Sequence, residues 1–112
     1  MYHLTELETA HRWSLNTITI VNNNHRLAQG LRNLNFAYGE RSGHKEELFV
    51  YKETDFARVA QDFGCAGIRV EKPEELAPAL EWAQSQSLPV VVDVVSDPMA
   101  LPDLPWSPAN AM

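Results

Sequence analysis

Three consecutive asparagines, Asn22, Asn23 and Asn24, carry the most distinctive chemistry in this chain. Neutral amide oxygens are hard ligands that suit Mg²⁺ or Ca²⁺. Asparagine also adopts turn conformations and caps helices, because its side chain bonds to nearby backbone groups. The residue types alone therefore leave two interpretations open, a capped turn after a strand or part of a metal site, and they favour the turn.

The other reactive side chains form no zinc or nucleophile motif. Cys65 has no base beside it in the sequence, so we predict a packed thiol. Asp93 lies inside an apolar run, where a carboxylate needs partners from the backbone or from a helix end. None of the histidines shows the close spacing of zinc ligands, and only His25, which follows the asparagines, is placed near a site. The histidines are His3, His11, His25 and His44.

The elements that position these residues alternate between strand and helix. The apolar runs 17–23 and 89–95 are typical of buried parallel strands, and 67–70 predicts a shorter one. Apolar residues at three- and four-residue spacing predict helices over 4–13, 25–34, 55–63 and 73–86. This alternation indicates an α/β fold, with a parallel sheet that carries helices on its faces. Ligands bind beyond the carboxyl ends of such strands, which is where the asparagines lie.

Several helix ends can be assigned from residue type. Thr5 and Glu8 have the spacing of a capping box, and the alternative is a cap further upstream. Asp55 is expected to cap the helix over 55–63, and Gly64 to end it. Pro78 lies inside the helix over 73–86, so either the regular helix begins near Pro78 after an initial turn, or it is kinked there.

Composition limits the classes of protein to which this chain can belong. Its 112 residues make about one small domain, and its net charge of −6 argues against nucleic-acid binding. We find no membrane span and no signal peptide. The single cysteine suggests a reducing, cytoplasmic compartment. Residues 99–112 are rich in proline, and we predict an extended tail there, after a domain over residues 1–98.

One longer pattern is more specific than these parts. Residues 1–24 read MYHLTELETAHRWSLNTITIVNNN, a helix bearing LTELETA, then a β-branched strand, then paired asparagines. This pattern resembles the second half of the cofactor motif of thiamine diphosphate-dependent enzymes, in the acetolactate synthase, pyruvate oxidase and benzoylformate decarboxylase group. The downstream sequence as far as Pro98 is similar to the end of their C-terminal domain. The resemblance implies part of a three-layer, doubly wound parallel sheet whose N-terminal strands are missing.

The resemblance also implies a set of site residues. In the family, the second asparagine of the pair and a backbone carbonyl two residues later hold Mg²⁺, which bridges the diphosphate to the protein. Alignment without gaps places these ligands at Asn24 and at the carbonyl of Arg26, with Asn23 as the first of the pair. A shift of one residue would make Asn23 the ligand. The cofactor-binding residues implied are Asn23, Asn24, His25, Arg26, Leu27, Gln29 and Leu31.

The chain also departs from the family. The Gly-Asp-Gly that opens the motif is absent, and the glutamate that activates the cofactor comes from another domain in these enzymes. Gln29-Gly30 lies two residues later than the Gln-Gly of acetolactate synthases. We therefore expect a fragment of a decarboxylase or carboligase acting on 2-keto acids, inactive alone and without catalytic residues of its own. It would associate with its own missing domains or form a homo-oligomer. The alternative is a non-enzymatic binding or regulatory module that reuses the fold.

Overall fold

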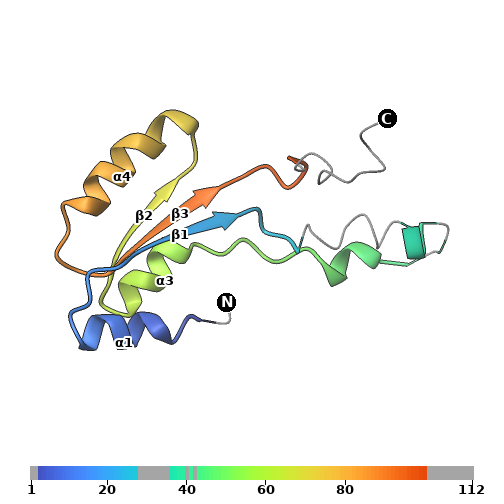
Figure 1. The fold of residues 1–112 in the computed structure, drawn as a ribbon. Coiled ribbons are helices and arrows are strands. Elements are labelled where there is room, and N and C mark those ends of the chain that lie inside the picture. The colour runs from blue at the N-terminus through green and yellow to red at the C-terminus, as the bar shows by residue number, and fades with distance from the viewer. Residues whose placement is uncertain (1–2, 28–35, 40, 42, 101–112) are drawn as a thin grey trace, which may run out of the picture.

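A three-stranded parallel sheet organises the chain. The computed structural model describes residues 3–27, 36–39, 41 and 43–100. Within them the strands lie in the order β1-β3-β2, so the last strand in sequence is the central one (Figure 1). The strands are β1 (Ile18–Asn23), β2 (Ala66–Val70) and β3 (Val90–Val95). The helices are α1 (Glu6–Arg12), α3 (Phe56–Asp62) and α4 (Leu76–Gln84), with short 3₁₀ turns η2 (Lys45–Leu48) and η3 (Pro73–Glu75).

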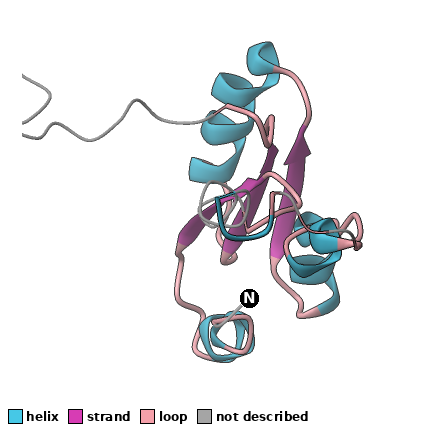
Figure 2. Cartoon of the chain, turned by 90° about the vertical axis from the view of Figure 1, so that its right-hand side faces the viewer, coloured by secondary structure: helices cyan, strands magenta, loops and turns pink. Residues whose placement is uncertain are grey.

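Helices lie on both faces of the sheet and give it three layers (Figures 1 and 2). On one face, Ala79 and Ala83 of α4 pack against Val90 and Val92 of β3. The other face bears α3, with α1 beside it, and its buried residues are Ala60, Cys65 and Val91, with Leu7 of α1 packed against them. The alternation of side chains along β3 sends neighbouring valines to opposite faces, as expected for a strand buried on both sides. The predicted α/β class is confirmed.

β1 differs from the buried strand that its apolar sequence predicts. It lies at the edge of the sheet, and only its last residue, Asn23, is buried. Ile18 and Ile20 pair in register with valines that face α4, but α4 packs over β2 and β3. These two residues are therefore left 41% and 56% exposed. Strand composition predicts pairing, but what covers a strand depends on its neighbours in space.

The helix ends agree with most of the predictions. The side chain of Asp55 accepts a hydrogen bond from the amide of Arg58 at 2.9 Å, and Gly64 follows α3 with a φ of +80°. The capping box at Thr5 is wrong, because Thr5 makes no side-chain cap hydrogen bond and has helical dihedrals. Pro78 is the third residue of α4, where a backbone N–H has no partner within the helix. The helix therefore starts just before Pro78, after the turn η3, and needs no kink.

The helix predicted over 25–34 is wrong at its start. Residues 25–27 are not helical, and Arg26 forms an isolated antiparallel bridge with Val50 instead. Residues 28–35 lie outside the described part of the chain, as do residues 101–112 of the proline-rich tail. Among the described residues, no helix is both long enough and apolar enough to cross a membrane.

The start of α4 gives a prediction about pH. Hydrogen bonds from the amides of Glu71 and Lys72, at 3.0 and 3.1 Å, hold the pKa of Glu75 below its ordinary range. A carboxyl whose pKa is lower when folded stabilises the fold above its unfolded pKa, and this contribution disappears as the pH falls through the folded value. Glu75→Gln should therefore be less stable than the native chain at pH 7 and equally stable at an acid pH at which the carboxyl of Glu75 is protonated in both the folded and the unfolded chain.

Urea unfolding at both pH values measures this difference. The matched control is Glu74→Gln, which removes a neighbouring charge that accepts neither amide. A stability deficit of Glu75→Gln that is the same at both pH values would show that ionisation of Glu75 does not contribute.

Candidate functional site at the end of β1

The chain turns sharply where β1 ends, and we call residues 23–26 the asparagine turn. Asn23 is only 4% exposed, and both ends of its side chain are occupied. Its Nδ2 donates to the carbonyl of Thr54 at 2.9 Å, and its Oδ1 accepts the amide of His25 at 3.3 Å. The side chain of Asn23 therefore points into the protein and ties β1 to the segment that precedes α3.

Asn24 is more accessible. Its Oδ1 accepts the amide of Arg26 at 3.0 Å, which closes a short side-chain turn. An amide oxygen has two lone pairs, so one acceptor site remains on Asn24 Oδ1. The carbonyl of Arg26 accepts no hydrogen bond from any described residue. The turn thus contains two oxygen atoms that can serve as metal ligands and lie close together in the sequence. One belongs to a side chain and the other to the backbone.

His25, between these oxygen atoms, has an unusual conformation. Its φ is +53°, a left-handed value that histidine and asparagine adopt more often than most residues. Its carbonyl accepts the amide of Tyr51 at 2.8 Å, and the amide of Leu27 bonds to the carbonyl of Phe49. These bonds hold the turn against the segment from 49 to 51. The Nδ1 of His25 is buried and has no partner among the described residues.

The remaining predicted cofactor residues are placed only in part. Leu27 follows the turn directly, and the residue is 54% exposed. Gln29 and Leu31 lie outside the described residues, so their positions relative to the turn stay a prediction. The structure brings Asn23, Asn24, His25 and Arg26 together at one edge of the sheet, at the carboxyl end of β1 as the parallel topology requires.

A buried ion pair behind the turn was not predicted from the sequence. Arg69 of β2 and Asp93 of β3 are paired in register, and Arg69 Nη1 lies 2.9 Å from Asp93 Oδ2. Asp93 is fully buried and also accepts the amide of Phe56, the first residue of α3, at 3.0 Å. The expectation that Asp93 bonds a helix end is therefore confirmed. An arginine within a short apolar strand is the sequence signal that could have identified its partner.

The surroundings of Arg69 favour its charged form. Burial works against the charged form, but hydrogen bonds to Glu71 and Asp93 and the charge of Asp93 outweigh it, and the pKa of Arg69 is raised. The contacts with Glu53 and Glu71 involve carboxylates that are largely exposed, so these two pairs stabilise the fold little. The contact with Asp93 is the one that is shielded from water.

The oxygen atoms of the asparagine turn could supply some of the ligands that a hard divalent cation needs. Asn24 and the Arg26 carbonyl supply neutral oxygens, the ligand type that Mg²⁺ accepts. In the described part of the chain, no group of three or more acidic, histidine or cysteine side chains could hold a metal on its own. An octahedral Mg²⁺ site would therefore need additional oxygen ligands besides those of the asparagine turn.

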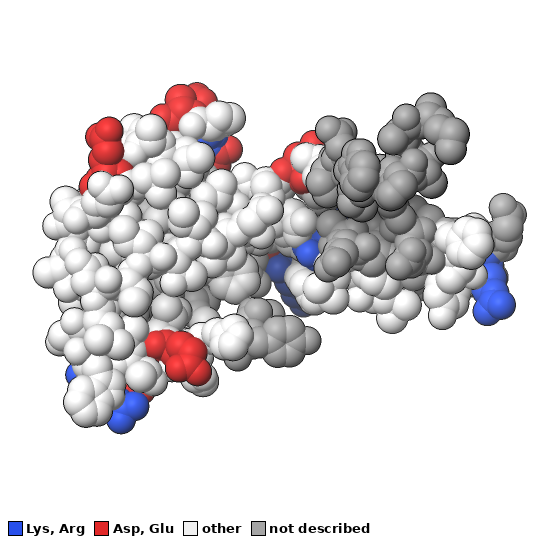
Figure 3. All heavy atoms as spheres, viewed as in Figure 1, with Lys and Arg blue, Asp and Glu red and all other residues white. Residues whose placement is uncertain are grey.

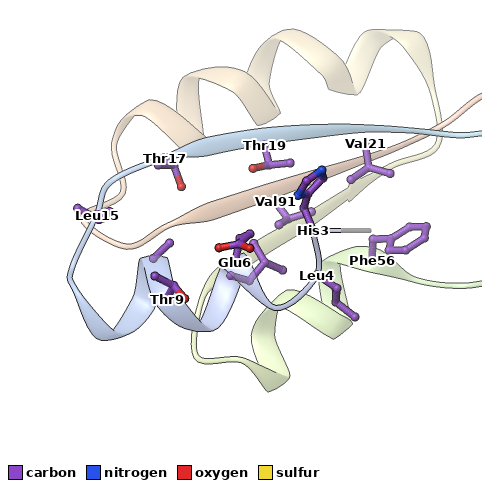
Figure 4. A pocket seen from close by; sticks show the side chains of 12 residues that line it. His3, Leu4, Glu6, Thr9, Leu15, Thr17, Thr19, Val21, Phe56 and Val91 are labelled. Carbon is purple, nitrogen blue, oxygen red and sulfur yellow. The ribbon is translucent and has the colours of Figure 1, made fainter. Parts of the chain in front are cut away.

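The described residues also form an apolar cavity of about 600 Å³ between α1 and β1 (Figure 4). Figure 4 shows Thr19 and Val21 of β1 on one side, with Leu4 and Glu6 opposite and Phe56 at one end. None of the described residues that are predicted to bind a cofactor lines it. Its mainly apolar walls give it no evident part in diphosphate or metal binding.

The surface over the strands is uncharged on the face shown in Figure 3. Red and blue atoms lie toward the top, the bottom and the right-hand edge of the large part of the molecule at the left of the view, and its middle is white. This agrees with the sequence of β1, ITIVNN, which contains no ionisable residue.

Cys65 lies in the core beneath α3 and is buried. Burial raises the pKa of its thiol, and the predicted packed thiol is confirmed.

Comparison with known proteins agrees with this arrangement. The family model for the C-terminal TPP binding domain of thiamine pyrophosphate (thiamine diphosphate) enzymes matches residues 1–94. The mitochondrial acetolactate synthase catalytic subunit of Aspergillus candidus is 30% identical over 107 residues, covering 96% of this chain and 15% of the relative. The acetolactate synthase large subunit of Haemophilus influenzae is 30% identical over 96 residues, covering 85% of this chain and 16% of the relative.

A shorter match is closer in sequence. The glyoxylate carboligase of Escherichia coli O157:H7 is 47% identical over 45 residues, covering 37% of this chain and 8% of the relative. The chain thus spans a small part of the length of the curated relatives it matches. The family match covers residues 1–94. This region contains the parallel sheet between helices and the asparagine turn at the end of β1. The chain belongs to the thiamine pyrophosphate enzyme family, in the region of its C-terminal cofactor-binding domain.

Proposed function

We propose that residues 1–98 supply one side of a thiamine diphosphate and Mg²⁺ site in an acetolactate synthase-like decarboxylase or carboligase that acts on 2-keto acids. The observation that carries this proposal is the asparagine turn, which presents the Asn24 Oδ1 and Arg26 carbonyl oxygens at the carboxyl end of β1. Family membership and the names of the relatives support the cofactor and the class of substrate.

In this proposal, Asn24 and Arg26 hold Mg²⁺, and the remaining ligands come from outside the chain. The bound cofactor would supply an electron sink for loss of CO₂ from the keto acid. The part of this chain is to bind and orient. Asn23 anchors the turn, and His25 and Leu27 fix it to residues 49–51 through backbone hydrogen bonds. The chain by itself should not release CO₂, because the described residues include no group placed to activate the cofactor.

The alternative, a self-sufficient binding module, is less well supported by the surface of β1. A module that works alone should cover its apolar residues, because an uncharged strand edge invites pairing with other chains. Here Ile18 and Ile20 are exposed at that edge, and no charged residue of β1 protects it. This pattern favours a chain that works as part of a larger structure.

The experiment that tests the proposal begins with the nucleotide sequence before the Met1 codon. We expect an open frame that encodes Gly-Asp-Gly shortly upstream. The protein encoded by that whole frame should bind thiamine diphosphate only when Mg²⁺ is present and should release CO₂ from pyruvate or glyoxylate. Purified residues 1–112 should release none. A stop codon close upstream, or CO₂ release by residues 1–112 alone, would contradict the proposal.

A further inference from the structure

Burying the Arg69–Asp93 ion pair inside a small fold costs desolvation free energy. Asp93 is fully buried, and its Oδ1 has no hydrogen-bond partner among the described residues. The desolvation of a buried carboxylate is often not recovered by its ion pair, and apolar residues of similar volume are frequently as stable. Stability alone therefore gives a poor account of this pair.

The contacts of the pair lead to the asparagine turn. Arg69 Nη1 donates to Asp93 Oδ2 at 2.9 Å and also to the carbonyl of Thr54 at 3.3 Å. The same Thr54 carbonyl accepts Nδ2 of Asn23 at 2.9 Å. Asp93 Oδ2 accepts the amide of Phe56 as well. The ion pair thus fixes the backbone on both sides of Asp55, at the point where Asn23 is attached.

We propose that Arg69 and Asp93 are positioning residues for the asparagine turn and act through Thr54 and Asn23. Neither belongs to the turn, and both lie on neighbouring strands behind it. If the Thr54 carbonyl moves, the side chain of Asn23 loses its acceptor, and the hydrogen bond that the amide of His25 donates to Asn23 Oδ1 is weakened. The functional part of this inference rests on the function proposed above, because it assumes that the turn holds the metal.

The test uses a variant that removes the charges but fills the space. In Arg69→Met/Asp93→Leu, we expect the chain to fold, with a free energy of unfolding that is lowered mainly by the loss of the acceptor for the Phe56 amide. Hydrogen exchange followed by NMR on residues 1–112 should show at least tenfold lower protection of the Asn23 side-chain amide. The amide resonance of His25 should shift. Unchanged protection and an unchanged resonance in a folded double variant would overturn the proposal.

Two further variants keep the test decisive. Glu53→Gln and Glu71→Gln remove the exposed partners of Arg69, and both should leave the exchange of the turn unchanged. Where the double variant does not fold, Arg69→Lys replaces it. Lysine keeps the charge beside Asp93 but lacks the planar guanidinium that reaches several acceptors at once, so the turn should still loosen. Native exchange in a folded Arg69→Lys chain would then overturn the proposal.

The functional readout is the apparent Mg²⁺ affinity of the protein encoded by the whole reading frame, measured at fixed thiamine diphosphate. The double variant should weaken it about tenfold, as the loss of supporting residues does at other metal sites. A looser turn with unchanged Mg²⁺ affinity would overturn the positioning role. If the native protein binds no thiamine diphosphate, the proposed function fails, and the exchange measurement still decides whether the pair positions the turn.

Discussion

Replacing Gly67 with alanine is expected to destabilise this fold by about 3 kcal/mol, near the upper end of the cost of overpacking a core. Gly67 lies in β2 where α3 crosses it. A Cβ at this position would lie 2.2 Å from the carbonyl oxygen of Ala57 and 2.8 Å from its carbonyl carbon. These are backbone atoms of a helix, so relief requires the whole helix to move away from the sheet. Urea unfolding followed by circular dichroism measures the loss.

A second variant distinguishes a backbone clash from side-chain crowding. In Gly67→Ala/Ala57→Gly, the helix loses its methyl group at the point of contact, but the carbonyl of residue 57 remains. We therefore expect no rescue. Recovery of stability in the double variant would show that side-chain volume, and not helix backbone, sets the approach of α3 to β2. The side chain of Gln61 in α3 donates from Nε2 to the carbonyl of Gly67 at 3.0 Å, so movement of α3 away from β2 should weaken this hydrogen bond.

The largest functional effect is expected from Asn24→Ala. Under the proposed function, this change in the protein encoded by the whole reading frame should lower Mg²⁺-dependent affinity for thiamine diphosphate roughly 100-fold, because the proposal makes Asn24 a direct ligand, and a direct ligand matters at least as much as its supporting residues. Stability should fall little, since the side chain of Asn24 makes one local hydrogen bond to the amide of Arg26. Calorimetric titration with and without Mg²⁺ measures the affinity, and thermal unfolding of the apoprotein measures stability.

Asn23→Ala is the matched comparison, and its main effect should be a loss of stability. Its side chain is buried and makes two hydrogen bonds, so its loss should cost about 1–3 kcal/mol of stability. The remaining affinity should keep its dependence on Mg²⁺. If Asn23→Ala abolishes the Mg²⁺ effect while Asn24→Ala preserves it, the motif is shifted by one residue and Asn23 is the metal ligand.

The sequence determined the elements of the fold and their order, for reasons that are local. β-Branched runs form strands, Asp55 caps the helix that follows it, and Gly64 accepts the left-handed backbone that ends that helix. The buried strand at 89–95 was recognisable because a strand covered on both faces is apolar at consecutive positions. The LTELETA helix, the strand and the asparagines indicated the family, and the comparisons confirmed it.

The candidate site could be predicted only as a segment. Residue type and the end of a parallel strand pointed to residues 22–26. The sequence left open whether Asn23 or Asn24 faces outward, because that depends on the Thr54 carbonyl, which lies 31 positions away from Asn23 in the chain. The helix predicted from residue 25 was wrong at its start, because Arg26 bridges to Val50 and a local pattern contains no information about that partner.

What the sequence by itself determined is therefore the family, the α/β class and the segment that ends β1. The tertiary structure alone decided that β1 is an exposed edge, that Asn23 points inward, that Arg69 meets Asp93, and that α3 crosses the sheet at Gly67. The physical reason is the range of the forces involved. Caps, turns and strand propensities act between near neighbours, whereas burial, ion pairing and close backbone contact depend on which distant segments the completed sheet brings together.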